Sequence, residues 1–175
     1  TLVSSSAASD VYKRQEESLP EVLKREIMDP IGASSSWNWY GYEKSKILLN
    51  GAIFGSVSGG GHFGGGLFIN SLDHARFGLL FLRNGKWKNE LLLSSEWIKL
   101  VQQPSKNNES YGYMWWLNKG ERKWRGLSEN IYYGAGFGGN FIVIIPDQNL
   151  VVVARWIDSS KIGEFIEMVV TSAIG

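Results

Sequence analysis

Two apolar runs separated by a short polar turn constrain the fold of this chain more than any other feature. The runs are Phe141–Ile145 and Leu150–Ala154, and Pro146 and Asn149 bound the four residues between them. Continuous runs rich in Val and Ile are typical of strands that are buried on both faces. Proline suits the fixed φ angle of a turn. The sequence therefore predicts an antiparallel hairpin inside a covered sheet.

Two helices are predicted in the first half of the chain. Ser18 and Glu21 have the spacing of a capping box, which marks a helix start. Ser71 is the expected N-cap of the second helix, with Asp73 near its positive end. Gly85 is expected to supply the left-handed residue that ends this second helix.

Two further helices are predicted in the second half. Ser94 is the expected N-cap of a short helix. The face that this helix buries is predicted to consist of Trp97, Leu100 and Val101. Residues 162–173 carry apolar side chains at helical spacing, so this segment is expected to lie on the sheet.

Two other segments are predicted to form strands. Residues 111–117 are rich in aromatic residues and are expected to form one strand that is covered on both faces. Residues 46–51 are expected to form one arm of a hairpin that turns at Asn50 and Gly51. The strands come late, helices flank them, and no alternating βαβ order occurs. This order predicts an α+β fold in which helices flank an antiparallel sheet.

The composition excludes several functional classes. A chain of 175 residues has the size of one domain, and its net charge of +1 argues against binding to nucleic acid or to an anionic membrane. No apolar run reaches the length of a transmembrane segment. The absence of cysteine excludes disulfides and thiolate catalysis, and with only two histidines a zinc site is not expected.

The first fifteen residues do not resemble the rest of the chain. They are rich in Ser and Ala, then basic, and they lack an apolar period. Residues 10–15 resemble the in-frame translation of a transposase adapter used to build sequencing libraries. We therefore treat residues 1–15 as a non-native tail and residues 16–175 as the domain. On this interpretation the protein continues upstream, and this chain is a fragment of it.

Glycine is concentrated in two segments, residues 56–67 and 132–140. Such segments let a ligand or another chain approach the backbone closely, so we expect the two to face each other across one pocket. Both match the G-x-G-x-x-G pattern of dinucleotide sites. The first lacks a suitably placed carboxylate and the second runs into a strand, so a nucleotide site is disfavoured.

Several segments in a fixed order carry a resemblance to a known family. These segments are residues 56–85, 93–97, 111–116 and 134–156. They resemble the C-terminal half of the serine β-lactamase-like hydrolases, which include class C β-lactamases, penicillin-binding proteins, related esterases and 6-aminohexanoate-dimer hydrolases. The resemblance covers residues 16–175. It implies an acyl-enzyme reaction on a small ester or amide substrate, with no metal or organic cofactor.

Two catalytic elements of that family do not occur in this chain. The family uses a serine nucleophile in S-x-x-K, whose lysine takes the proton, and a tyrosine in Y-x-N. Neither pattern is present here. In the family both lie upstream of the resembling region, so this fragment is expected to be inactive alone, whereas its full-length parent is expected to be an enzyme.

The third catalytic element of the family is a K-T-G or H-x-G triad on a strand beside the nucleophile. The resemblance places Gly134, Ala135 and Gly136 on this triad, or Tyr132 to Gly134 if the alignment shifts by two residues. In the first register, the Phe137 amide would form the oxyanion hole. Neither register puts a lysine or histidine on the triad, so the cation that binds a substrate carboxylate is missing. This favours neutral esters or amides as substrates.

Three more residues are candidates for contact with a substrate. Tyr133 precedes the triad in the first register, and His62 and Gly61 lie in the first glycine-rich segment. We expect His62 to hydrogen-bond or to wall the pocket more readily than to act as a catalytic base, because no partner carboxylate is evident.

Two alternatives to catalysis remain open from the sequence. The first is a carbohydrate-binding module that uses aromatic side chains as stacking platforms. The candidates for these platforms are Trp115, Trp116, Trp124 and Tyr132. The second alternative is a family member that has lost catalysis and works as a sensor or scaffold.

Overall fold

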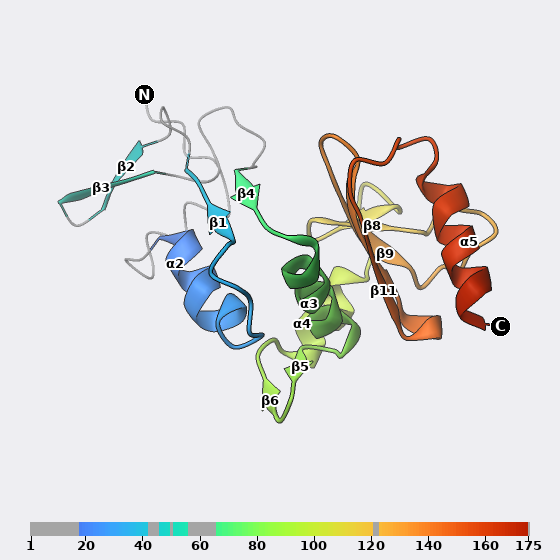
Figure 1. Ribbon diagram of the computed structural model, residues 1–175, viewed down its shortest axis with the longest axis horizontal. Helices are drawn as coiled ribbons and strands as arrows, with labels where there is room; N and C mark the ends of the chain where they lie inside the picture. Colours follow the sequence, from blue (N-terminus) through green and yellow to red (C-terminus); the bar gives the residue numbers. More distant parts are fainter. Residues whose placement is uncertain (1–17, 42–45, 50, 56–65, 121–122, 175) are drawn as a thin grey trace. The chain divides into compact units, whose positions relative to one another are not determined.

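A computed structural model of the chain describes residues 18–41, 46–49, 51–55, 66–120 and 123–174 (Figure 1). The chain divides into two compact units, which we call unit 1 (Thr1–Asp73) and unit 2 (His74–Gly175). The boundary falls in the first turn of helix α3 (Ser71–Leu82). Within the described residues, no helix is both long enough and apolar enough to cross a membrane.

Unit 1 contains the predicted capped helix. The Glu21 amide donates to Ser18 Oγ at 3.4 Å, and the Ser18 amide donates to the Glu21 carboxylate at 3.2 Å. Both bonds of the capping box are therefore present, which confirms the prediction. Helix α2 (Leu19–Leu23) then widens into the π-helix η1 (Lys24–Met28).

The predicted hairpin in unit 1 is also confirmed. Strand β2 (Lys46–Leu49) pairs antiparallel with β3 (Ala52–Gly55). Gly51 adopts a φ angle of 82°, as a two-residue turn of this kind requires. Asn50, the other predicted turn residue, lies outside the described residues. The second strand pair of unit 1 joins β1 (Asn38–Trp39) to β4 (Leu67–Phe68).

A buried carboxylate joins two distant segments of unit 1. Asp73 is fully buried, and its Oδ2 accepts hydrogen bonds from the Ser34 amide at 3.1 Å and the Ser34 hydroxyl at 2.6 Å. Asn70 Nδ2 donates to the same oxygen at 2.6 Å. The Asp73 amide donates to Asn70 Oδ1 at 2.9 Å. The start of α3 is thus capped by Asn70, and the predicted N-cap Ser71 is wrong by one residue, because asparagine accepts this bond equally well.

Unit 2 holds most of the regular structure. Its further elements are β5 (Lys86–Trp87), β6 (Glu90–Leu91), α4 (Ser95–Val101), β7 (Tyr111–Gly112), β8 (Trp115–Leu117), β9 (Tyr132–Gly136), β10 (Asn140–Ile145), the 3-10 helix η2 (Pro146–Gln148), β11 (Leu150–Ala154) and α5 (Ile162–Ile174). Five of the strands form one antiparallel sheet in the order β11-β10-β9-β8-β7. This arrangement is an α+β fold, as predicted.

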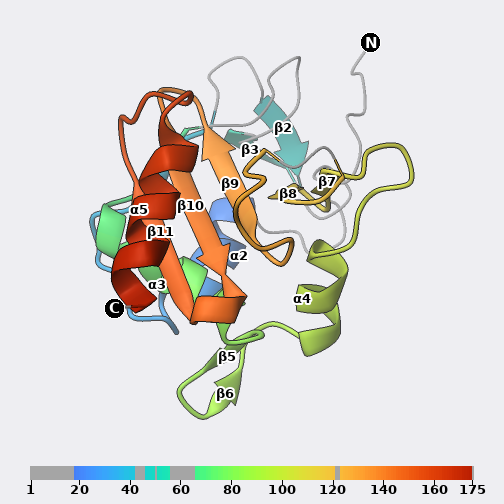
Figure 2. The same ribbon diagram turned by 90° about the vertical axis from the view of Figure 1, so that its right-hand side faces the viewer.

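The predicted hairpin of apolar strands forms the centre of this sheet. β10 lies between β9 and β11, and Figure 2 shows these three strands side by side, with α5 in front of the β11 side of the sheet. Alternate residues of β10 point to opposite faces. Phe141, Val143 and Ile145 join an apolar cluster with α5, whereas Ile142 and Ile144 join a second cluster with residues of α3 and α4. Apolar side chains therefore cover both faces of β10.

Helix α3 ends at two left-handed residues. The Asn84 amide donates to the Phe81 carbonyl oxygen at 3.0 Å, and the Gly85 amide donates to the Leu80 carbonyl oxygen at 2.9 Å. These two bonds are those of a Schellman motif. Gly85 is left-handed as predicted, with φ of 83°, but Asn84 at 53° is the first left-handed residue.

Helix α4 has the predicted cap and a different buried face. The Trp97 amide donates to Ser94 Oγ at 3.1 Å, which confirms the cap. Ile98 and Val101 are fully buried, whereas Trp97 is 40% exposed and Leu100 is 43% exposed. The predicted face that contained Trp97 and Leu100 is therefore wrong. In a helix of only seven residues, the apolar spacing is compatible with two alternative buried faces. The face that packs against the sheet is the aliphatic one, with Ile98 and Val101.

The aromatic segment 111–117 is a hairpin, so the prediction of a single strand is wrong. β7 pairs with β8, with Gly112 opposite Trp115. The two residues between them, Tyr113 and Met114, have φ angles of 49° and 72°. Two consecutive left-handed residues make the turn that connects tight hairpins, and such turns normally contain Asn or Gly. Tyr and Met gave no turn signal in the sequence.

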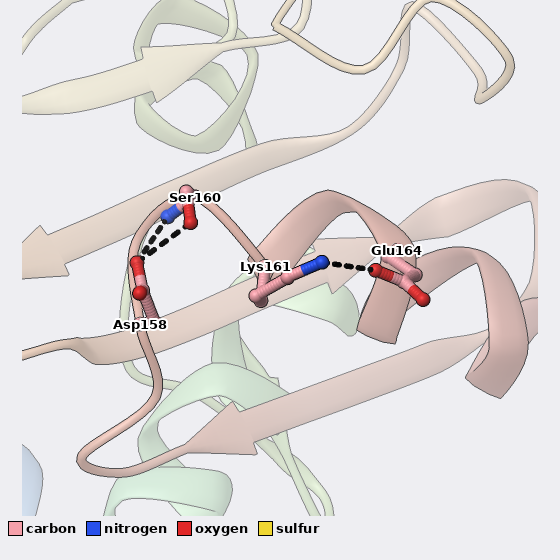
Figure 3. A network of polar contacts seen from close by, with 4 residues as sticks. All are labelled: Asp158, Ser160, Lys161 and Glu164. Atoms are coloured by element: carbon pink, nitrogen blue, oxygen red, sulfur yellow. Dashed lines mark hydrogen bonds and ion pairs between the residues drawn. The ribbon is translucent and has the colours of Figure 1, made fainter.

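The start of helix α5 is fixed by local polar contacts (Figure 3). Asp158 Oδ1 accepts hydrogen bonds from both the amide and the hydroxyl of Ser160, each at 2.8 Å. Lys161 Nζ lies 3.2 Å from Glu164 Oε2, an exposed ion pair one helical turn apart. The apolar face that begins at Ile162 is buried against the sheet at Ile166 and Val170, as the helical spacing predicted.

Candidate functional site

Strand β9 has one edge that is only half covered. Along its full length it pairs with β10, from Tyr132 opposite Ile144 to Gly136 opposite Asn140. On its other side β8 pairs only with Tyr132 and Tyr133. Within the described residues, no strand pairs with residues 134–136 on that side. Their backbone groups can therefore accept an extended ligand as an additional strand.

The side chains along β9 differ between its two halves. Tyr132 is 1% exposed and Tyr133 is 4% exposed, and burial raises the pKa of both phenols above the ordinary value. From Gly134 to Gly136 the side chains are small or absent. A Cβ atom on Gly134 would lie 3.0 Å from Ile142, so the core also restricts this position. The uncovered edge thus coincides with the small residues Gly134, Ala135 and Gly136.

The turn after β9 requires glycine at two positions. Gly138 and Gly139 both adopt a φ angle of 77°. A Cβ atom on Gly139 would overlap the Ile157 carbonyl group, and the Ile157 amide donates to the Gly139 carbonyl oxygen at 3.2 Å. A Cβ atom on Gly138 would lie 3.4 Å from the indole ring of Trp156. The turn is therefore fixed against the segment that follows β11.

Phe137 occupies the first position of this turn, and its side chain is fully exposed. Its carbonyl oxygen accepts a hydrogen bond from Asn140 Nδ2 at 2.7 Å. Asn140 Oδ1 in turn accepts a hydrogen bond from Arg155 Nη1 at 3.3 Å. These contacts hold the backbone next to the Phe137 amide in one conformation.

Arg155 also contacts the one histidine that the structure describes. Its Nη2 lies 3.0 Å from His74 Nδ1. Since arginine can only donate, Nδ1 accepts this bond and the ring proton lies on Nε2. Burial, and next the positive charge of Arg155, lower the pKa of His74 to about 4. The imidazole is therefore neutral near pH 7.

Some predicted site residues lie outside the described part of the chain. They are Gly61 and His62, and with them most of the glycine-rich segment 56–67. The expectation that the two glycine-rich segments face each other across one pocket therefore stays a prediction. Tyr133, Gly134, Ala135, Gly136 and Phe137 lie consecutively on β9 and its turn.

The aromatic residues proposed as carbohydrate platforms are mostly core residues. Trp115 is 8% exposed, Trp124 is 4% exposed and Tyr132 is 1% exposed. Trp116, at 39%, is the one of the four that presents part of its ring to solvent. Ring stacking on a sugar needs an accessible face, so this set does not form a stacking platform.

Sequence reasoning missed the polar residues that support the turn. Arg155 directly follows a predicted strand, and His74 lies in the first turn of a helix. They are 81 positions apart in the sequence, and no local pattern pairs them. The contact of Asn140 with Phe137 spans only three residues. The sequence could have indicated it, because asparagine side chains commonly hydrogen-bond to nearby backbone in turns.

Solved structures of other proteins share the fold of this chain. No protein-family model matches the chain, and no curated protein matches it significantly. A solved structure from Bacillus anthracis, provisionally assigned as a 6-aminohexanoate-dimer hydrolase, matches with a TM-score of 0.67 at 20% identity and covers 95% of this chain. A structure from Bacteroides dorei DSM 17855, provisionally assigned as a β-lactamase, matches with a TM-score of 0.61 at 14% identity and covers 96% of this chain.

These likenesses show that the chain has a β-lactamase-like fold, as the resemblance predicted. The chain spans only part of each solved structure. The aligned region is 40% of the Bacillus anthracis chain and 55% of the Bacteroides dorei chain.

Proposed function

We propose that this chain is the C-terminal portion of a serine hydrolase with a β-lactamase-like fold. Residues 16–175 form the domain portion, and the serine nucleophile, its lysine base and the tyrosine would come from sequence upstream. The substrate is a small ester or amide that forms an acyl-enzyme. The observation that carries this proposal is the uncovered edge of β9, which ends in a rigid turn.

The geometry of β9 supports the register in which Gly134, Ala135 and Gly136 occupy the triad. In the alternative register, Tyr132 and Tyr133 would have to present the edge to a substrate. Both are buried, and β8 covers their edge. The open edge begins only after them.

In the supported register, the Phe137 amide follows the triad and stabilises the developing oxyanion together with the amide of the upstream serine. An oxyanion hole works because its donors are fixed before the charge develops. The hydrogen bonds of Asn140 and Arg155, and the contact of Gly139 with Ile157, supply this fixation. The neighbouring Gly136 lets a carbonyl group approach the backbone closely.

Labelling with a serine-directed fluorophosphonate tests the proposal. The protein expressed with its upstream coding sequence should be labelled at one serine and should hydrolyse activated esters. Residues 16–175 alone should remain unlabelled. Labelling of this shorter chain, or no labelling of the extended protein, would contradict the proposal.

A pair of substitutions tests the role assigned to the Phe137 amide. Phe137→Pro removes the N–H donor, and in the extended protein we expect turnover to fall by about 10²–10³ while the serine stays reactive to the probe. Phe137→Ala keeps the donor and should retain activity within a few-fold. Equal losses in both variants would show that the side chain, not the amide, is required.

A further inference from the structure

A hollow of about 320 Å³ lies in unit 2 next to the candidate triad. Its lining residues are Ser110, Trp116, Leu117, Lys123, Tyr133 and Ala135. All but Ser110 come from β8, β9 and the loop between these strands, and Ser110 directly precedes β7. The hollow therefore shares Tyr133 and Ala135 with the strand that we propose to bind substrate.

One wall of this hollow is aromatic. The ring centroids of Trp116 and Tyr133 lie 6.5 Å apart, and the ring planes differ by only 18°. Tyr111 packs edge-on against Trp116, with ring centroids 4.8 Å apart. Because Trp124 contacts the Tyr133 ring at 4.5 Å, the wall is supported from both sides. Ala135 contributes only a methyl group, which leaves room beside the rings.

Among the described residues that line the hollow, Lys123 carries the only charge. Its Nζ lies 5.8 Å from the Tyr133 ring centroid and 5.6 Å from the Phe141 ring centroid. None of the described lining residues is a carboxylate. An exposed contact of this kind to a ring is weak, whereas a hydrogen bond to a carboxylate is charge-assisted.

The loop that carries Lys123 is anchored by a buried asparagine. Asn118 is fully buried, and its Oδ1 accepts a hydrogen bond from the Trp124 amide at 3.0 Å. Its Nδ2 donates to the carbonyl oxygens of Trp124 at 3.0 Å and Ser128 at 2.9 Å. These bonds fix the backbone next to Lys123 beside the aromatic wall.

We propose that this hollow binds a carboxylate attached to a small planar apolar group, with Lys123 as its cationic partner. The planar group lies against Trp116, and the carboxylate reaches Lys123 Nζ. The inference rests on the proposed function for one point, that the bound group is part of the substrate. On this view the cation missing from the triad is supplied by another segment, so carboxylate-bearing esters or amides become substrates, contrary to the expectation from the triad alone.

Titration of the purified 175-residue chain with benzoate, followed by NMR, tests the inference. The Ala135 methyl and Trp116 indole signals should shift and saturate. Benzamide, a neutral molecule of the same shape, should bind at least about tenfold more weakly, because it lacks the charge. Phenylphosphonate serves as a second anion, and binding as tight as that of benzoate would contradict the choice of a carboxylate.

Three variants locate the binding. Lys123→Met should weaken benzoate binding by about tenfold or more, whereas Lys123→Arg should retain most of it. Ala135→Leu should block binding by filling the space beside the rings. Lys119→Met is the matched control, since Lys119 Nζ donates to the Gln102 carbonyl oxygen and does not line the hollow. Unchanged dispersion of the remaining NMR signals shows that each variant is folded.

The inference is overturned if the unmodified chain does not bind benzoate, if Lys123→Met binds it as well as Lys123→Arg does, or if benzamide binds equally well. None of these outcomes depends on a serine nucleophile. They are therefore distinct from failure of the fluorophosphonate test, which concerns the hydrolase proposal itself.

Discussion

The two units of this chain are stabilised by different kinds of contact. In unit 2, apolar clusters cover both faces of a five-stranded sheet. Within the described residues of unit 1, the buried apolar side chains are Ile27, Met28 and Ile31. Among the same described residues, Asp73 is the fully buried polar group, and it holds Ser34 and Asn70. The candidate catalytic strand therefore lies in the unit that has a substantial core of its own.

Truncation of a buried side chain on the central strand should give the largest loss of stability that this comparison predicts. Ile144 is fully buried in β10, so Ile144→Ala removes apolar contacts and leaves a cavity at the centre of unit 2. We expect a loss of about 2–5 kcal/mol in the free energy of unfolding. Urea denaturation followed by tryptophan fluorescence measures it.

The matched control makes the same substitution in unit 1. Ile53 lies on β3 and is 69% exposed. Ile53→Ala should change the free energy of unfolding by less than about 0.5 kcal/mol. Similar losses in the two variants would contradict the view that unit 2 carries the apolar stability.

The sequence predicted the parts of the fold that depend on periodicity. The β10–β11 hairpin and helix α5 were found because their apolar residues recur at strand and helix spacing. The capping box at Ser18 and the N-cap at Ser94 were found because capping uses a short list of polar residues at fixed spacing.

The errors arose where tertiary contacts override local signals. Tyr113 and Met114 form a tight turn with residues that normally avoid left-handed conformations, so only the pairing of β7 with β8 reveals it. Lys123 was not singled out, because its place beside Tyr133 depends on the bonds that Asn118 makes to the loop. The family resemblance placed the triad on the segment that forms β9, but sequence reasoning did not find the side chains that support the following turn.

Substitution of one left-handed glycine in each unit should give effects on stability of intermediate size. Gly139 in unit 2 and Gly51 in unit 1 have φ angles of 77° and 82°. A Cβ atom on Gly51 meets no atom within 4 Å, whereas one on Gly139 would overlap the Ile157 carbonyl group. Gly51→Ala should cost about 1–2 kcal/mol for the backbone conformation alone. Gly139→Ala should cost more, on the order of 3 kcal/mol, because the steric overlap adds to this strain.

Thermal unfolding of the two glycine variants measures the difference. In the extended protein, Gly139→Ala should also reduce turnover, because it displaces the turn that carries the Phe137 amide. Gly51→Ala should leave turnover unchanged. Equal destabilisation by the two substitutions would mean that the Ile157 contact does not constrain the turn.

Lowering the pH should destabilise unit 2, because this unit keeps a histidine neutral in a buried polar contact. The pKa of His74 is about 4 in the folded protein and has the ordinary value of 6.5 when unfolded. Between these values the unfolded state binds more protons, so stability falls as the pH is lowered from 6.5 to 4 and does not fall further on this account below pH 4. We expect a loss of roughly 2 kcal/mol over this window. His74→Asn keeps an acceptor for Arg155 but does not titrate, so its stability should change less between pH 6.5 and 4. Urea denaturation at several pH values compares the two proteins, and parallel pH curves would show that His74 does not carry this dependence.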